Sequence, residues 1–322
     1  MMDTMIDLAI VPVAGQGTRL LPSTKSQPKE MLPVGRKPAV QYVVEELAQS
    51  GMKRMLFITG PGKTSIENHF DVNPELVIYL RETGREELLE ELEFERTVPE
   101  YYYTRQRRQL GLGHAVLCAE SLVGDQPFVV ALGDTILGLN EPSHIVSAMK
   151  KEFVRLHADA LVALVAVSSD EAGNYGMVQF SDQAEETLPK SHRQSLGQEP
   201  IRLTDVIEKP AVGEAPSRYS IAARYVFSPI VFQYLKNLNP GRSGEIELTD
   251  GLREMIQDDK KVYGMCLEPG KQRRDIGNVE SYFRAFMELA LTDEKYGKNM
   301  RKQMTEFLRN HGSDPDGKIV SN

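Results

Sequence analysis

The chain of 322 residues carries a formal net charge of −8, with 41% hydrophobic and 26% charged residues. This composition is typical of an ordinary globular protein with one large domain or two closely packed ones. The acidic balance argues against a broad nucleic-acid-binding surface, because a phosphate backbone requires an extended basic face. No apolar run approaches the roughly 20 residues that span a bilayer, so a membrane protein is not expected.

The amino-terminal residues and the two cysteines predict a cytoplasmic protein. Residues 1–13 hold two acidic side chains and no basic one, unlike a secretory signal. Cys118 and Cys266 lie far apart and have no CxxC spacing or histidine-rich neighbour. Two buried, reduced thiols are therefore favoured over a disulfide framework or a zinc site. We expect neither nucleic acid nor membrane among the partners.

Short β-branched runs predict the strands of an α/β fold. Several are apolar on consecutive residues, as expected for strands covered on both faces of a largely parallel sheet. The runs are residues 8–14, 54–60, 128–134, 160–167, 222–228 and 262–268. Helical patterns separate them, so we predict a mixed, mostly parallel central sheet flanked by helices. In such sheets ligands bind beyond the carboxyl ends of the strands.

Apolar spacing and capping residues predict helices between these strands. Apolar residues recur at helical spacing from 40 to 47, and Ser50-Gly51 offers a stop. Ser228 before a proline predicts the N-cap of a second helix. Asn278 predicts the cap of a third, whose apolar residues from 279 to 286 share a face.

Three polar stretches are expected to lie outside the core. The acidic run 85–95 has helical spacing and predicts a solvated helix face. Residues 181–200 predict a mobile polar excursion between strands. The charged tail after about residue 295 predicts a frayed end or a contact between subunits.

Two glycine-rich stretches match familiar nucleotide-binding motifs only in part. GPGKTS (60–65) lacks the first glycine of a Walker A loop, because Phe57 stands at that position. GLGHA (111–115) would need a glycine at Val116 to be a dinucleotide fingerprint. The six histidines form no zinc-binding pattern. We reject all three functions on these grounds.

The loop after the first predicted strand concentrates positive charge. Residues 16–40 contain five basic side chains and one acidic one, a local balance of +4 in an acidic chain. Glycines 15 and 17 let the main chain approach an anion closely. Arg19 can hold phosphate oxygens with two hydrogen bonds, and Lys29 supplies a compact charge. The loop alone fits either a phosphate site or a glycine turn with solvated bases.

The amino-acid sequence of this loop favours the phosphate site over the glycine turn. GQGTRLLPSTKSQPKEMLPVGRKPAVQYVVEEL, which begins at Gly15, resembles the signature of the sugar-1-phosphate nucleotidylyltransferases. SIENHFD (65–71), GLGHAVLCA (111–119) and GEIELTDGL (244–252) are similar to the bacterial UTP–glucose-1-phosphate uridylyltransferases of that family. The resemblance implies a Rossmann-like nucleotidyltransferase fold and Mg²⁺. It also implies transfer of a uridylyl group from UTP to glucose 1-phosphate by direct displacement.

On the nucleotide side, the resemblance assigns a role to each matching residue of the basic loop. Ala14, Gly15 and Gly17 would run along the base and phosphates. Arg19 would hold the departing β- and γ-phosphates. Lys29 would touch the α-phosphate, where charge builds in the transition state. These two side chains are the expected catalytic residues.

Further along the chain, the resemblance implies base-reading residues and two metal ligands. Gln106 would read the pyrimidine edge, and Gly111 would lie close to the base. An amide suits uracil, whose edge presents a donor and an acceptor. Asp134 in LGDT and Asp275 in RRDIGN would bind Mg²⁺, although 141 positions separate them.

The sugar side is implied by two further motifs. Gly176 in NYGMV would allow close approach of the hexose. In VIEKP, Glu208 would bind sugar hydroxyls and Lys209 the phosphate of glucose 1-phosphate. Arg224 and His114 are weaker site candidates, whose alternatives are a structural role and helix capping.

The resemblance also implies an organisation and leaves alternatives open. We expect one nucleotidyltransferase domain over 1–295, with nucleotide binding in about 8–135 and sugar-phosphate binding in about 136–295. A tail would follow over 296–322, and the family resemblance suggests a homodimer or homotetramer. Alternative functions are transfer from dTTP or to another sugar 1-phosphate, and a non-catalytic regulatory paralogue.

Overall fold

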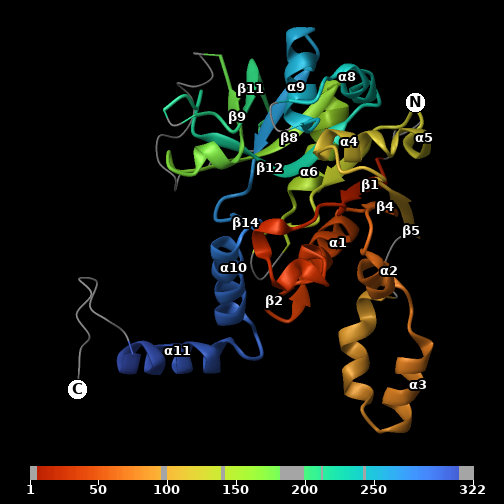
Figure 1. The fold of residues 1–322 in the computed structure, drawn as a ribbon, viewed down its shortest axis with the longest axis vertical. Coiled ribbons are helices and arrows are strands. Elements are labelled where there is room, and N and C mark those ends of the chain that lie inside the picture. The colour runs from red at the N-terminus through yellow and green to blue at the C-terminus, as the bar shows by residue number, and fades with distance from the viewer. Residues whose placement is uncertain are drawn as a thin grey trace.

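A mixed β-sheet runs through the centre of the protein (Figure 1). The computed structural model describes residues 6–95, 100–138, 142–181, 199–211, 213–241 and 244–311. The main path of the sheet has the order β10-β13-β8-β12-β6-β1-β4-β5, and β9 and β11 join it through β12. The strands are β1 (Leu8–Pro12), β4 (Arg54–Thr59), β5 (Glu100–Arg105), β6 (Phe128–Ala131), β8 (Ala160–Ala166), β9 (Gly176–Gln179), β10 (Ile201–Arg202), β11 (Asp205–Glu208), β12 (Tyr219–Phe227) and β13 (Val262–Cys266).

The strand directions confirm the predicted mixed, mostly parallel sheet. β5, β4, β1 and β6 run parallel to one another, and β8 and β13 form a second parallel pair. β12 lies between these groups and is antiparallel to both, and β10 is antiparallel to β13. On the main path, therefore, only β12 and β10 oppose the other strands. All six predicted β-branched runs contain a strand.

Helices cover both faces of the sheet and bury two separate cores. Successive residues of β1 alternate between them: Ile10 packs with α4, α5, α8 and α9, whereas Val11 packs with α1, α2 and α6. The strands formed by the predicted apolar runs are buried on both faces, which explains why consecutive residues in these runs are apolar. The helices are α1 (Ala39–Gln49), α2 (Thr64–Phe70), α3 (Pro74–Glu82), α4 (Leu112–Leu117), α5 (Glu120–Val123), α6 (Ile145–Leu156), α8 (Val231–Asn237), α9 (Leu248–Gln257), α10 (Val279–Thr292) and α11 (Gly297–His311).

Short elements complete the fold around the basic loop. Antiparallel pairing joins β2 to β3 and β7 to β14. These elements are β2 (Pro33–Val34), β3 (Lys37–Pro38), β7 (Thr135–Leu137), β14 (Arg273–Asp275) and the 3₁₀ turns η1 (Thr18–Leu20), η2 (Ser23–Lys25), η3 (Lys29–Met31), η4 (Glu86–Glu95) and η5 (Ala172–Asn174). Figure 1 shows α10 running away from the sheet, with α11 turning off its far end. Among the described residues, no helix combines the length and the apolar character that crossing a membrane requires.

The predicted helix boundaries were right in two cases and wrong in one. The helix at 40–47 is α1, and its apolar face is buried. Asn278 caps α10 in a reciprocal capping box with Ser281. Ser228 does not cap a helix: α8 begins at Val231, and the buried Ser228 hydroxyl has no hydrogen-bond partner among the described residues.

The predicted polar stretches have different outcomes. Residues 86–95 form a 3₁₀ turn rather than an α-helix, with most of its described side chains exposed. The excursion predicted at 181–200 lies, except for its ends, outside the described residues. Of the predicted tail, residues 297–311 form α11, and 312–322 lie outside the described residues.

Candidate active site

One cavity of about 670 Å³ gathers every residue expected to act in catalysis, substrate binding or metal binding, whereas the weaker candidates Arg224 and His114 do not line it. It opens where the loops after β1, β5 and β6 meet β9, β11 and β14. The predicted residues in its wall are Ala14, Gly15, Gly17, Arg19, Lys29, Gln106, Gly111, Asp134, Gly176, Glu208, Lys209 and Asp275. The cavity thus lies beyond the carboxyl ends of β1 and β6, where ligands bind in open α/β sheets.

A largely buried ion pair lines this cavity. Lys29 Nζ donates a hydrogen bond to Asp134 Oδ2, and less than a fifth of either side chain is exposed. Burial lowers the pKa of Lys29, but the charges of Asp134 and Glu30 outweigh it and leave that pKa above its usual value. Burial raises the pKa of Asp134, yet the Lys29 charge holds it below its usual range. Both groups are therefore ionised at neutral pH.

A second ion pair involves Glu30, the residue that follows Lys29. Lys63 Nζ lies 2.9 Å from Glu30 Oε2, and both side chains are almost fully buried. Lys63 is the lysine of the GPGKTS stretch, which matched a Walker A loop only in part. Its side chain pairs with a carboxylate inside the protein. Burial raises the pKa of Glu30, which the charges of Lys29 and Lys63 partly offset.

Backbone pairing brings the two predicted metal ligands together. Asp275 pairs with Thr135 in the β7–β14 ladder, and Ile276 N donates to Asp134 O over 3.0 Å. The Asp275 carboxylate accepts from the Tyr175 hydroxyl at 2.9 Å and from Gly277 N at 3.2 Å. A strand pairing thus spans the 141 positions between the aspartates.

Arg19 approaches Asp275 from the basic loop. A Cβ atom added to Gly277 would lie 3.2 Å from Asp275 Oδ1 and 3.7 Å from Arg19 Nη2. The absence of a side chain at Gly277 therefore leaves room for the guanidinium beside the carboxylate. The cavity wall places this arginine with Lys29 and the two aspartates.

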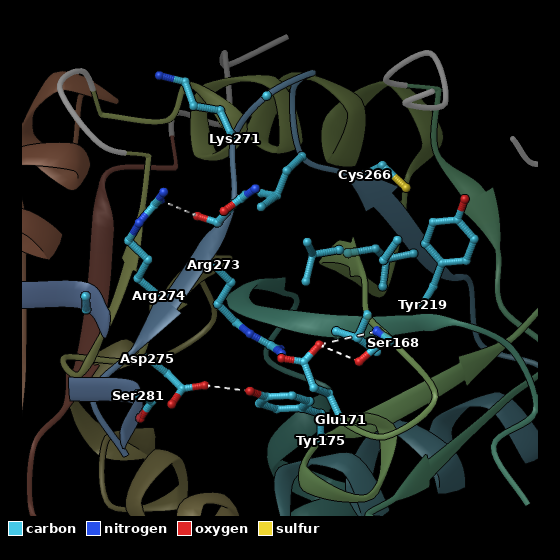
Figure 2. A pocket seen from close by; sticks show the side chains of 18 of the residues that line it. Ser168, Glu171, Tyr175, Tyr219, Cys266, Lys271, Arg273, Arg274, Asp275 and Ser281 are labelled. Atoms are coloured by element: carbon cyan, nitrogen blue, oxygen red, sulfur yellow. Dashed lines mark hydrogen bonds between the residues drawn. The ribbon is translucent and has the colours of Figure 1, made fainter. Parts of the chain in front are cut away.

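A second cavity of about 640 Å³ lies behind these residues and shares Tyr175, Arg273 and Asp275 with the first. Figure 2 shows the Tyr175 hydroxyl directed at the Asp275 carboxylate and the Arg273 side chain extending toward the Tyr175 ring. The Arg273 guanidinium stacks 3.4 Å from the Tyr175 ring centroid and donates to Ile221 O over 2.8 Å. Tyr175 and Arg273 therefore form a wall between the two cavities.

Gln106 and Gly111, which the sequence predicts to meet the base, form one part of the first cavity. Gln106 is 3% exposed, and its Nε2 lies 3.0 Å from Gly111 O and 2.9 Å from His114 Nδ1. Gly111 has a φ of +98°, and a Cβ there would lie 2.6 Å from Ile246 O. Only glycine fits this position, where GLGHA docks on the GEIELTDGL stretch.

The part of the cavity predicted to bind the sugar phosphate is built around the Glu208 carboxylate. It accepts from Thr249 Oγ1 at 2.9 Å and lies 2.7 Å from Lys209 Nζ. Gly176 lies directly beneath, since a Cβ there would be 2.6 Å from Thr249 Cγ2 and 3.2 Å from Glu208 Oε2. Lys209 is half exposed and can turn toward an incoming anion.

Arg224, a weaker sequence candidate, lies outside the cavity. Its side chain is fully buried and bonds Glu46 through two atoms, at 3.1 and 2.6 Å, and Thr135 O at 3.0 Å. It joins α1, β12 and the strand that follows Asp134. These contacts favour the structural alternative that the sequence left open for Arg224.

The cavity wall also holds residues to which the sequence analysis gave no role, among them Gln109, Tyr175, Thr249 and Arg273. Gln109 Nε2 donates to Ala14 O over 2.6 Å and so ties the loop after β5 to the basic loop. Tyr175 and Thr249 stand inside motifs that were already recognised, NYGMV and GEIELTDGL. Their positions within those motifs were the available signal.

The fold and cavity agree with comparisons to known proteins. The nucleotidyl transferase family profile matches residues 8–292. The chain belongs to the nucleotidyl transferase family. It is 38% identical over 300 residues to the UTP–glucose-1-phosphate uridylyltransferase YngB of Bacillus subtilis, covering 93% of each chain. A second B. subtilis uridylyltransferase is 36% identical over 300 residues, with 93% of this chain and 95% of that one covered.

Solved structures show the same relationship. UDP-glucose pyrophosphorylase of Acinetobacter baumannii superposes with a TM-score of 0.80 at 35% identity, covering 94% of this chain and 100% of that one. A UTP-bound form from the same species has a TM-score of 0.80 at 36% identity and covers 94% and 99%. A UDP-glucose pyrophosphorylase complexed with UDP-glucose has a TM-score of 0.74 at 32% identity and covers 88% and 97%. The family and fold inferred from the sequence are thereby confirmed.

Proposed function

We propose that this protein transfers a uridylyl group from UTP to glucose 1-phosphate, giving UDP-glucose and pyrophosphate. The observation that carries this proposal is the convergence on one cavity of the residues expected in catalysis, substrate binding and metal binding. Relatives that share more than a third of their residues over nearly the whole chain bear the name of this activity. Related structures contain UTP and UDP-glucose, the nucleotide substrate and sugar product of the proposed reaction.

The reaction is a single in-line displacement. A phosphate oxygen of glucose 1-phosphate attacks the α-phosphorus of UTP and forms a new P–O bond. The bond from the α-phosphorus to the oxygen that bridges to the β-phosphate breaks, and pyrophosphate leaves with that electron pair. Such chemistry depends on positioning and charge stabilisation and requires no nucleophilic side chain. The cavity supplies these functions through Arg19 and Lys29.

Lys29 stabilises the charge that develops on the α-phosphate, and Arg19 holds the leaving phosphates. Support for Lys29 comes from its small exposure and its charge, since the Asp134 carboxylate keeps it protonated before substrate arrives. Arg19 is exposed and lines the same cavity. Fixed charges in a desolvated site stabilise a transition state more than mobile charges in water. When the α-phosphate enters, Lys29 can exchange its carboxylate partner for phosphate oxygen.

Asp134 and Asp275 are the proposed ligands of a Mg²⁺ ion. Their fit rests on two oxygen donors that neighbouring backbone segments bring to one cavity. Among the described residues, no cluster of three or more metal-binding side chains exists that could hold a metal alone. Mg²⁺ typically takes one or two carboxylates and completes its shell with phosphate and water oxygens. Bound there, Mg²⁺ would neutralise phosphate charge.

Gly176, Glu208 and Lys209 bind the sugar phosphate in this proposal. Glu208 accepts hydrogen bonds from the hexose hydroxyls, and the bare backbone at Gly176 leaves space for the ring. Lys209 exchanges Glu208 for the phosphate of glucose 1-phosphate. Ala14, Gly15, Gly17, Gln106 and Gly111 line the opposite end and receive the nucleotide.

A pyrophosphate-release assay tests the function. The purified protein with Mg²⁺ should release pyrophosphate from UTP only when glucose 1-phosphate is also present. Higher rates with dTTP or with another sugar 1-phosphate would identify the related nucleotidylyltransferase alternative. UTP binding without pyrophosphate release, with any sugar phosphate, would indicate a regulatory paralogue and overturn the proposal.

We further propose that the protein works as a homodimer or homotetramer in the cytoplasm. Support for self-association comes from α10, where Val279, Phe283, Phe286 and Met287 are all more than a third exposed. Contiguous exposed apolar side chains commonly mark protein interfaces. Cys118 and Cys266 are free thiols, which suits a reducing compartment. Sedimentation analysis of the full chain and of Phe283→Glu would test the assembly.

A further inference from the structure

Gln106 is held by two hydrogen-bond acceptors. Its Nε2 lies 3.0 Å from Gly111 O and 2.9 Å from His114 Nδ1. An amide nitrogen has two hydrogens, so both are used by these contacts. Among the described residues, Gln106 Oε1 has no hydrogen-bond partner of its own, although the residue lines the cavity.

These contacts define which end of the amide faces the cavity. A carbonyl oxygen can only accept, so the atom of Gln106 that meets Gly111 O must be the NH₂ nitrogen. The same nitrogen meets His114 Nδ1, which must therefore be an acceptor. Because both N–H groups are engaged, the amide plane is fixed and Oε1 remains for a ligand.

We propose that His114 is a specificity-determining positioning residue, which locks the Gln106 amide so that it presents an acceptor to the N3–H of uracil. This inference rests on the proposed function, in which Gln106 lies against the base. Cytosine carries an acceptor at N3, where uracil carries a donor. A fixed Oε1 therefore attracts UTP and repels CTP at that atom, and specificity follows from the repulsion as much as from the attraction.

The hydrogen bond from Gln106 requires a neutral His114 ring whose Nδ1 is unprotonated. Burial lowers the pKa of His114, which favours the neutral ring at physiological pH. Cys118 Sγ lies 3.9 Å from the same Nδ1, one helical turn along α4, and burial raises the pKa of that thiol. A neutral thiol is a weak hydrogen-bonding group, so Cys118 competes little with the Gln106 amide for Nδ1.

Two substitutions separate positioning from packing. His114→Phe keeps an aromatic ring but removes the acceptor. His114→Asn loses the ring but can place Oδ1 where Nδ1 stands. The ratio of kcat/KM for UTP to that for CTP, measured with glucose 1-phosphate, should fall about 3- to 10-fold in His114→Phe, the worth of one neutral hydrogen bond. It should stay within about twofold of the wild-type ratio in His114→Asn. A packing role predicts the opposite order.

A double-mutant cycle tests whether His114 acts through Gln106. In the Gln106→Ala background, His114→Phe should leave the UTP-to-CTP ratio unchanged, because no amide remains to be oriented. Calorimetric binding of UTP and of CTP, without glucose 1-phosphate, supplies a second readout that does not depend on turnover. Cys118→Ala is the matched control: it touches His114 but not Gln106, and should keep the wild-type ratio.

The outcomes distinguish this proposal from the proposed function. If the wild-type protein makes UDP-glucose with a UTP preference that His114→Phe retains, the positioning role is wrong and the function stands. If the effect of His114→Phe persists in the Gln106→Ala background, His114 acts by another route and the proposal also fails. A wild-type protein that does not prefer UTP to CTP would contradict both.

Discussion

The nucleotide side and the sugar side of the cavity hold their charges in different ways. On the nucleotide side, Lys29–Asp134 and Lys63–Glu30 are ion pairs in which every side chain is less than one-fifth exposed. On the sugar side, Lys209 is 53% exposed and lies near two carboxylates, at 2.7 Å from Glu208 and 4.0 Å from Glu247. The first arrangement is rigid and the second is open.

This difference matches what each side must do in the proposed reaction. The attacked phosphorus requires charges fixed in advance, because reorganising them during the reaction raises the barrier. The sugar phosphate must enter and leave, so its cation gains from mobility. Substitutions on the nucleotide side should therefore act on kcat, and those on the sugar side on KM for glucose 1-phosphate.

The largest effect is expected at Asp134. Asp134→Ala removes a proposed metal ligand and leaves the buried Lys29 without its carboxylate partner. We expect a loss of activity of at least about 10³-fold, because a metal-site group and the orientation of Lys29 are lost together. Activity measured against Mg²⁺ concentration, with circular dichroism to verify folding, checks this. An unchanged Mg²⁺ dependence in a folded variant would reject Asp134 as a ligand.

Lys29→Ala should lower kcat by about 10²- to 10³-fold, the loss typical of one well-placed transition-state donor. The KM for glucose 1-phosphate should change much less. Lys25→Ala is the matched control, since Lys25 belongs to the same loop but is exposed, and it does not line the cavity. Steady-state kinetics of both variants make the comparison. Near-wild-type turnover in Lys29→Ala would remove this lysine from the chemistry.

Lys209→Ala should raise the KM for glucose 1-phosphate about 10-fold and leave kcat within a few-fold of wild type. The reason is that an exposed cation contributes to ground-state binding more than to the transition state. The KM for UTP should stay constant, which serves as the internal control. A kcat loss as large as that of Lys29→Ala would contradict the difference between the two sides.

Much of the fold could be predicted because burial on both faces marks the strand sequences. The run 160–167 and its counterparts became strands, and the apolar face of 40–47 became α1. The missed strand β5 reads Glu-Tyr-Tyr-Tyr-Thr-Arg, which is only partly buried and lacks an apolar run. Ser228 failed as an N-cap because α8 starts later, a boundary that tertiary contacts decide.

The sequence allowed roles to be predicted for residues that lie inside a recognised motif. It did not do so for residues whose role depends on a partner far away in the chain. Asp134 and Asp275 were chosen from motifs, but only the β7–β14 pairing explains how they meet. The role of Arg224 stayed open in the sequence because its partner Glu46 lies 178 positions away, in a different element. Tyr175 was overlooked because a tyrosine beside a glycine has no pattern of its own, although its hydroxyl binds Asp275.

The smallest expected effect is a pH-dependent stability difference on the sugar side. Burial and the Glu208 charge raise the pKa of Glu247 above its usual value, so the folded state binds a proton there more readily than the unfolded state. Ionised Glu247 therefore costs stability at neutral pH, and the cost disappears as pH falls through the folded pKa. Glu247→Gln should be more stable than wild type at pH 7 by at most about 1 kcal/mol, and this gain should shrink toward pH 5.

On the nucleotide side the sign is reversed, since Lys29 lowers the pKa of Asp134 and that contribution to stability persists until pH falls below the usual range of an aspartate. Thermal unfolding of the wild type and of Glu247→Gln between pH 7 and 5 measures the difference in stability between them. A stability gain of Glu247→Gln that grows on acidification would show that Glu247 is stabilised as an anion, contrary to the open, adjustable character of the sugar side.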